Sequence, residues 1–198
     1  MADREGAMRA VLAACAALAV ATSSGAGAPA LAKDKPKAFT LSSPDVKDGG
    51  MLARKFTGKS PNVKACDGEN VSPALHWTNV PDGTKSFALI MSDPVPRNGL
   101  GFVHWVAYDI PEAKRSLKQG DASTPSSEFK GGKNGIGSEV YFGPCPPVGD
   151  KAHPYAFVLL ATDLVPGNLK PGLTRDELAA ALKGHVLGQT SLVARYGH

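Results

Sequence analysis

The chain has 198 residues, of which 42% are hydrophobic and 20% charged, and its formal net charge is +4. With no glycine period and no long polar tract, this composition is that of a globular protein with one core, which excludes a fibrous or disordered chain. The basic residues are scattered and form no run, which argues against nucleic-acid binding. Glycine (22) and proline (16) predict many turns between short strands.

Residues 1–32 differ in composition from the rest and predict a signal peptide. The apolar run 10–21 has the length of a signal-peptide core and is too short to span a bilayer. Residues 1–9 carry two acids and two bases, so Met8 is a second candidate start. The small residues Ala30 and Ala32 predict cleavage near Ala32. We therefore expect a domain of residues 33–198, periplasmic or secreted, without a transmembrane segment after processing.

The three cysteines bear on how the chain is exported and cross-linked. Leu-Ala-Ala-Cys15 resembles a lipoprotein box, but Cys15 lies inside the apolar run instead of after it, which favours soluble export. Removal of Cys15 leaves Cys66 and Cys145. In an exported chain an even pair is more often a disulfide than two free thiols. The alternative is a reactive or metal-binding thiol pair, which the wide spacing disfavours.

Six segments combine apolar, aromatic or β-branched residues with flanking turn residues and predict strands. The strongest is 102–110, FVHWVAYDI, which stops at Pro111. The stretch 112–138 that follows has few large apolar residues and predicts a long surface loop. In chain order the predicted strands are 38–42, 74–80, 86–92, 102–110, 155–163 and 189–196.

Only one clear helix is predicted, and it comes late in the chain. Thr174 and Glu177 have the spacing of a capping box, Leu178 and Leu182 share one helical face, and Gly184 ends the pattern. The chain has no internal repeat and no alternation of strands with helices. These features predict a mainly β, antiparallel domain with a single late helix.

Three segments hold most of the residues able to bind a ligand: 92–96 with Asp93, 102–110 with His104, and 141–155. In the third, Gly143-Pro144-Cys145-Pro146-Pro147 is unable to form a regular strand or helix and predicts a stiff loop. His153 and Tyr155 follow it two residues apart and share one strand face. Imidazole and phenol donors beside a rigid loop suit phosphate or carboxylate oxygens, and an aspartate can fix a histidine tautomer.

Each of these residues also has a purely structural interpretation. In a regular strand His104 shares a face with Phe102, Val106 and Tyr108, and a single strand histidine is usually a core or edge residue. Asp93-Pro94 is a common turn starter. Taken from spacing alone, the pocket and the structural interpretation both stay open.

Together the three segments resemble the phosphatidylethanolamine-binding protein family, in particular its bacterial, Raf kinase inhibitor-like branch (YbhB/YbcL-type). The family pattern is an Asp-Pro-Asp-x-Pro turn, a His-Trp strand, and Gly-Pro-x-Pro-Pro-x-Gly followed by His-x-Tyr. Further matching stretches extend the resemblance over nearly the whole domain. The matching stretches are DPVP (93–96), GFVHWVAYDIP (101–111), YFGPCPPVGDKAHPYAF (141–157), CDGENVSPALHW (66–77), GGKNGIGS (131–138) and the ending 174–197.

The resemblance implies a large antiparallel sheet packed with a smaller one, a C-terminal helix, and a small anion pocket. Matched residue by residue, the pocket would use Asp93, His104, Gly143, Pro144, His153 and Tyr155. The two histidines and the tyrosine would donate to anion oxygens, and the aspartate would orient a histidine. The resemblance also implies that Cys66 and Cys145 lie near this pocket and are bonded.

Two departures from the family pattern affect the expected ligand. Val95 stands where the family has its second aspartate, which removes one acceptor for an amine head group. Pro154 replaces an arginine between His153 and Tyr155, which removes a charge and a backbone donor. The first departure makes ethanolamine recognition less expected than binding of the anionic group, and the second predicts a stiffer loop.

Three function classes follow. The first is an exported binding module for a small phosphate- or carboxylate-bearing ligand, without a cofactor. A form of this hypothesis has the module present its pocket to a protein target, since relatives are described as kinase or protease inhibitors. The second is a metal-assisted hydrolase using Asp93, His104 and His153. The third is a structural or interaction protein with a vestigial pocket. No nucleophile stands in an activating motif, so we expect no conventional enzyme.

Overall fold

The computed structural model describes residues 37–198, and the predicted signal peptide with its cleavage site lies outside them. In the part described, two antiparallel sheets and one short helix are present, as predicted. None of the helices in residues 37–198 is long and apolar enough to cross a membrane.

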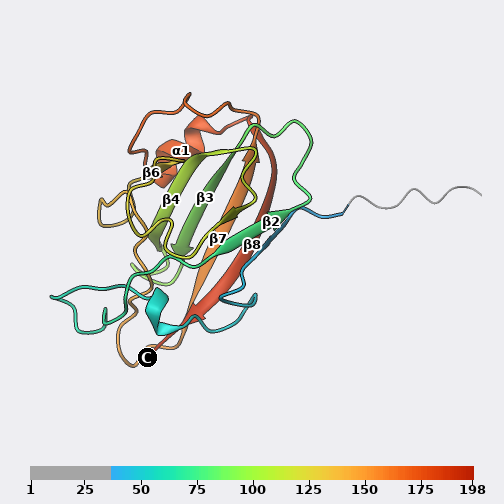
Figure 1. The fold of residues 1–198 in the computed structure, drawn as a ribbon. Helices are drawn as coiled ribbons and strands as arrows, with labels where there is room; N and C mark the ends of the chain where they lie inside the picture. The colour runs from blue at the N-terminus through green and yellow to red at the C-terminus, as the bar shows by residue number, and fades with distance from the viewer. Residues whose placement is uncertain (1–36) are drawn as a thin grey trace, which may run out of the picture. The chain divides into compact units, whose positions relative to one another are not determined.

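The larger sheet has five strands in the order β6-β4-β3-β7-β8. Figure 1 shows its four long strands side by side. All neighbouring pairs are antiparallel, and β3 lies at the centre between β4 and β7. The strands are β3 (Ser86–Asp93), β4 (Phe102–Pro111), β6 (Lys130–Gly132), β7 (His153–Thr162) and β8 (Val186–Tyr196).

The smaller sheet, β1-β2-β5, covers one face of the larger sheet. It consists of β1 (Thr40–Ser42), β2 (Leu75–Thr78) and β5 (Ser116–Leu117). Trp77 of β2 packs edge-on against Phe87 of β3, with ring centroids 5.3 Å apart. Both side chains are buried, because alternate residues of each strand point into the layer between the sheets.

The opposite face of the larger sheet is covered by helix α1 (Arg175–Ala181), which Figure 1 shows beside β4 and β6. Leu178 and Leu182 pack there with Val106 and Tyr108 in a second, smaller core. The predicted capping box is present: the Thr174 side chain accepts from the Glu177 backbone and the Glu177 carboxylate accepts from Thr174. This box satisfies backbone donors that the first helical turn leaves free.

The prediction of a long surface loop over residues 112–138 is wrong in part. The segment contributes β5 to the smaller sheet and β6 to the edge of the larger one. Three of its apolar side chains, Leu117, Ala122 and Phe129, are buried, whereas Ile136 is exposed. Strands of two or three residues leave no alternating pattern long enough to recognise in the sequence.

The predicted facing of His104 is wrong in part: His104 shares a side with Phe102 but not with Val106 and Tyr108, because β4 contains a β-bulge. Met91 pairs with Trp105, but the next residue of β3, Ser92, pairs with Val103, so His104 is the extra residue. The bulge places His104 on the same side as Trp105, whereas Val106 and Tyr108 face α1. A bulge re-aims side chains in this way at functional sites of many proteins.

A 3-10 turn, η1 (Arg54–Phe56), completes the described elements. It lies in the long connection between β1 and β2, and Phe56 at its end belongs to the core between the sheets. The carbonyl oxygen of Phe56 accepts from the buried Tyr141 hydroxyl at 2.7 Å. This turn therefore anchors the segment that leads from Tyr141 toward the candidate site.

Candidate binding site

A cavity of about 320 Å³ lies at the end of the larger sheet where β3 ends and β4 and β7 begin. Four of the predicted ligand residues line it: Asp93, His104, His153 and Tyr155. The aromatic rings of Phe102 and Phe142 and the prolines 96, 146 and 147 form much of the rest of the wall. The cavity thus combines a few polar groups with a mostly apolar lining, as small-molecule sites commonly do.

Asp93 at the end of β3 and His153 at the start of β7 are buried and lie within ion-pair distance of each other. His153 Nδ1 lies 2.6 Å from Asp93 Oδ2, and the two side chains are 6% and 2% exposed. Asp93 Oδ1 accepts from the backbone of Val95 at 2.9 Å, which holds the carboxylate in place. His153 Nε2 lies 3.4 Å from the exposed Asp150. The aspartate therefore orients the histidine, as the resemblance implied.

His104 is held by the loop on the other side of the cavity. Its Nδ1 lies 2.8 Å from the Phe142 carbonyl oxygen, and its ring stacks on Phe142 with centroids 6.0 Å apart. Burial lowers the pKa of His104, and the Phe142 carbonyl and the Asp93 charge only partly oppose this effect. The imidazole is therefore pushed toward its neutral form.

Tyr155 presents a buried hydroxyl that the protein itself does not satisfy. The side chain is fully buried in the core, yet its Oη has no hydrogen-bond partner within residues 37–198. Burial raises the pKa of Tyr155, and the Asp93 carboxylate, which lies close enough to interact with the hydroxyl, raises it further. The hydroxyl thus keeps its proton and, with no hydrogen bond of normal geometry in the described residues, can donate to a ligand oxygen.

Gly143 and Pro144, the other two predicted ligand residues, do not line the cavity. The Gly143 amide donates to Asn70 Oδ1 at 2.8 Å, and the Pro144 carbonyl accepts from Gly58 at 2.8 Å. A Cβ at position 143 would lie 2.2 Å from the Phe56 carbonyl oxygen, so only glycine fits against this chain. These residues fix the loop from behind, while their neighbours Phe142 and Cys145 face the cavity.

Sequence reasoning missed Asn70, which organises this loop. Its backbone is left-handed (φ 58°), and its side chain accepts from Gly143 and donates to the Tyr141 carbonyl at 3.0 Å. Asparagine is one of the few residues that adopts this backbone conformation readily. No local pattern links Asn70 with a loop 70 residues away, so the sequence held no signal for this role.

Cys66 and Cys145 form a disulfide bond, with their Cα atoms 5.0 Å apart, and both residues line the cavity. The bond joins two loops that are 79 residues apart in sequence. It therefore ties the stiff proline-containing loop to the loop preceding Asn70.

We expect the double substitution Cys66→Ser, Cys145→Ser to lower the free energy of unfolding by about 4 kcal/mol, because the reduced chain gains loop-closure entropy when it unfolds. Denaturant titration measures this change. Mass spectrometry of the unreduced protein should show the two cysteine-bearing peptides joined. Recovery of both as separately alkylated peptides would contradict the bond.

The mouth of the cavity carries exposed aliphatic side chains. Val63 and Ile136 line it and are 47% and 60% exposed. These two residues come from separate loops, which is why sequence periodicity does not reveal them. An apolar mouth favours a ligand with an apolar part next to its polar group.

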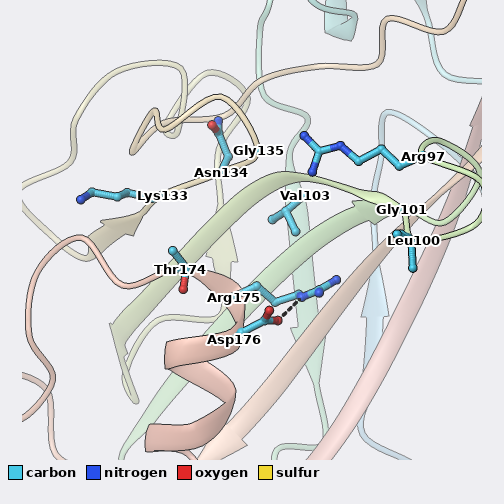
Figure 2. Close-up of a pocket in the computed structure, with 10 residues that line it drawn as sticks. All are labelled: Arg97, Leu100, Gly101, Val103, Lys133, Asn134, Gly135, Thr174, Arg175 and Asp176. Carbon is cyan, nitrogen blue, oxygen red and sulfur yellow. Dashed lines mark hydrogen bonds and ion pairs between the residues drawn. The ribbon is translucent and has the colours of Figure 1, made fainter.

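A second cavity of about 270 Å³ lies beside the start of β4, and no sequence feature predicted it. Figure 2 shows the side chain of Val103 between Arg97 and Arg175, with Lys133 pointing away. Arg175 Nε is already paired with Asp176 at 2.8 Å. Val103 faces this cavity while its neighbours Phe102 and His104 line the first one, as expected of alternate strand residues.

The predicted alternative, a metal site of Asp93, His104 and His153, is not assembled. Within residues 37–198, no group of three or more histidine, cysteine or acidic side chains is placed to hold a metal ion. The Nδ1 atoms of both histidines already face protein oxygens. The three residues share a cavity without converging on one point.

Comparison with known proteins agrees with this architecture. The profile of the family described as "Phosphatidylethanolamine-binding protein" matches residues 42–197. The chain belongs to the phosphatidylethanolamine-binding protein family. The matched residues include the whole larger sheet, β2 and β5 of the smaller one, the helix and every polar residue of the cavity.

The relatives place the chain in the bacterial YbcL/UPF0098 branch of the family. A UPF0098 protein of Aquifex aeolicus is 41% identical over 149 residues, covering 74% of this chain and 86% of that protein. UPF0098 protein YbcL of Escherichia coli is 36% identical over 138 residues, covering 65% and 72%. A Mycobacterium tuberculosis protein named putative lipoprotein LppC is 35% identical over 158 residues, covering 80% and 72%.

Solved structures of the family share the fold. The crystal structure of E. coli YbcL superposes with a TM-score of 0.73 at 28% identity, covering 81% of this chain and 98% of YbcL. A phosphatidylethanolamine-binding protein homologue from Chlamydia trachomatis gives a TM-score of 0.70 at 30% identity, covering 81% and 98%. The two-sheet arrangement with a single late helix is thus the family fold.

Proposed function

We propose that this protein is a non-enzymatic binding module that captures a small ligand through an anionic group, phosphate or carboxylate, in the cavity lined by Asp93, His104, His153 and Tyr155. The single observation that carries the proposal is the Tyr155 hydroxyl. It is fully buried and has no partner within residues 37–198. A buried donor left unsatisfied costs about 1–3 kcal/mol, and a bound ligand oxygen removes that cost.

The geometry around the hydroxyl supports a pre-formed site. The Asp93–His153 pair, the Phe142 carbonyl and the disulfide each hold one part of the wall. Little side-chain ordering is then left to occur on binding, which favours affinity. The exposed Val63 and Ile136 at the mouth support a ligand that carries an apolar part, or a protein target whose anionic side chain enters the cavity.

We also propose that the protein works outside the cytoplasm, in the periplasm or as a secreted protein. Two observations support this: the disulfide bond, which persists in oxidising compartments, and the relative named a lipoprotein. Export is tested by separating cells into spheroplast and periplasmic fractions and labelling the free thiols of the protein in each fraction. Recovery of the full-length chain in the cytoplasm, with reduced Cys66 and Cys145, would contradict export.

The binding proposal is tested by titrating the protein with phenyl phosphate and inorganic phosphate in a thermal-shift assay and by calorimetry. Ligand at one hundred times its dissociation constant should add about 2.7 kcal/mol of stability. His153→Ala should weaken binding at least about tenfold, the loss expected for one charge-assisted hydrogen bond. His76→Ala, which removes an exposed histidine of β2, is the matched control. Equal binding by both variants would refute the proposal.

A further inference from the structure

The second cavity, beside the start of β4, is lined by more basic than acidic side chains. The basic residues are Arg97, Lys133 and Arg175, and the acidic residue is Asp176. Figure 2 shows Arg97 and Arg175 on either side of Val103, whereas Lys133 points away. The cavity therefore combines an apolar surface with a guanidinium group on each side.

Both guanidinium groups keep hydrogen-bond donors that the chain does not use. Within residues 37–198, no acidic side chain lies within ion-pair distance of Arg97, whose guanidinium lies 5.4 Å from the centroid of the Phe102 ring. Arg175 donates to Asp176 through Nε, at 2.8 Å, and its two Nη groups make no hydrogen bond to the described residues. A carboxylate matches such donors, because its two oxygens fit the fork of a guanidinium.

The loop that carries Arg97 has an unusual backbone. Arg97 and Asn98 are both left-handed, with φ 57° each, a region that arginine adopts rarely. Strain of this kind persists mainly where the position of a residue serves a function. The Leu100 amide donates to the Arg97 carbonyl at 3.2 Å, and the Gly101 amide donates to the Pro96 carbonyl at 2.9 Å. These bonds hold the loop in the conformation that brings Arg97 to the cavity.

An exposed leucine borders the same cavity. Leu100 is 82% exposed, the largest fraction among the large hydrophobic side chains of residues 37–198. A small free anion would pair with Arg97 and Arg175 but would leave Leu100 in water. A protein segment with an apolar residue next to an acidic one would cover all three side chains. Arginine is enriched at protein interfaces, and the net charge of +4 favours an acidic partner.

We propose that this cavity is a second binding site, which docks a segment of a partner protein in which an acidic residue stands next to an apolar one. The carboxylate of the segment accepts from Arg97 and Arg175, and the apolar side chain packs on Val103 and Leu100. Val103 lines this cavity, whereas Phe102 lines the first one, so the two sites are distinct. Docking here does not depend on what the first cavity binds.

The probe that tests this is the capped peptide acetyl-Glu-Leu-Glu-Leu-amide, with acetyl-Gln-Leu-Gln-Leu-amide as its uncharged match. In a titration followed by amide NMR at low ionic strength, the acidic peptide should shift the signals of Leu100, Gly101 and Val103. The uncharged peptide should bind at least about threefold more weakly, the upper range for an exposed ion pair. Arg97→Gln and Arg175→Gln should each weaken binding of the acidic peptide by a similar factor.

The matched control is Lys183→Gln, which removes the same charge from an exposed residue outside the cavity lining. It should leave binding of the acidic peptide unchanged, and the amide spectrum of each free variant shows whether its fold is intact. Equal weakening by Lys183→Gln and Arg97→Gln would mean general charge attraction and would overturn the site. Shifts confined to residues of the first cavity, or no binding of the acidic peptide, would overturn it too.

An anionic lipid surface is the competing occupant of the cavity. Cosedimentation with vesicles of phosphatidylglycerol and phosphatidylcholine in equal parts tests it. Vesicle binding that is lost in Arg97→Gln, together with no binding of the acidic peptide, would assign the cavity to lipid and overturn docking of a protein segment. Because phenyl phosphate binding reports on the first cavity alone, the two proposals can fail separately.

Discussion

Replacement of Tyr155 by phenylalanine should stabilise the unliganded protein and weaken ligand binding at the same time. The hydroxyl is buried without a partner in the described chain, so its removal should raise the free energy of unfolding by about 1 kcal/mol. Loss of the same donor should weaken binding of phenyl phosphate at least about tenfold. Denaturant titration and calorimetry measure the two effects.

The matched control is Tyr141→Phe. Tyr141 is equally buried, but its hydroxyl donates to the Phe56 carbonyl oxygen at 2.7 Å. Its removal should lower the free energy of unfolding by about 1 kcal/mol and leave affinity for phenyl phosphate unchanged. The two tyrosine variants should therefore change the free energy of unfolding in opposite directions. A loss of stability in Tyr155→Phe equal to that in Tyr141→Phe would show that the Tyr155 hydroxyl is satisfied in the free protein.

Gly143→Ala should lower the free energy of unfolding by about 3 kcal/mol, because overpacking forces the backbone to move. A Cβ there would lie 2.2 Å from the Phe56 carbonyl oxygen and 2.6 Å from the Thr57 carbonyl carbon. The displaced loop would also lose the hydrogen bond from the Gly143 amide to Asn70. Denaturant titration gives the energy, and weakened binding of phenyl phosphate would report the displaced cavity wall.

Gly137→Ala is the comparison for the glycine substitution. Gly137 has a left-handed backbone (φ 79°) but nothing within 4 Å of its would-be Cβ, so only conformational strain of about 1–2 kcal/mol is expected. A loss of unfolding free energy in Gly143→Ala no greater than that in Gly137→Ala would mean that the loop relaxes freely. It would contradict a rigid wall behind the cavity.

Much of the fold was predictable from local patterns. All six predicted strands and the capped helix are present, since runs rich in aromatic and β-branched residues such as 102–110 and the Thr174–Glu177 box depend on near neighbours only. The short strands β5 and β6 were missed, because two or three residues carry no period. They pair only when the longer strands of the sheets have formed.

The candidate site was predictable in composition but not in detail. Asp93, His153 and Tyr155 lie together as the resemblance implied, and the Cys66–Cys145 bond is present. Gly143 and Pro144 support the loop from behind instead of lining the cavity. The two histidines were expected to act alike as donors, yet the Phe142 carbonyl makes His104 an acceptor when neutral. Motifs indicate which residues lie near the site, whereas the donor or acceptor role of each residue depends on all the atoms around it.

By itself the sequence determined that this is a mainly antiparallel β protein, and the ordered motifs identified its family. These properties follow from side-chain alternation, turn residues and residue spacing, all of which are local. Only the tertiary structure decided which way His104 points, because a bulge is set by pairing with β3. Only the tertiary structure buried the Tyr155 hydroxyl without a hydrogen bond of normal geometry in residues 37–198. Both depend on contacts between strands distant in sequence, where burial and register decide which polar atoms remain for a ligand.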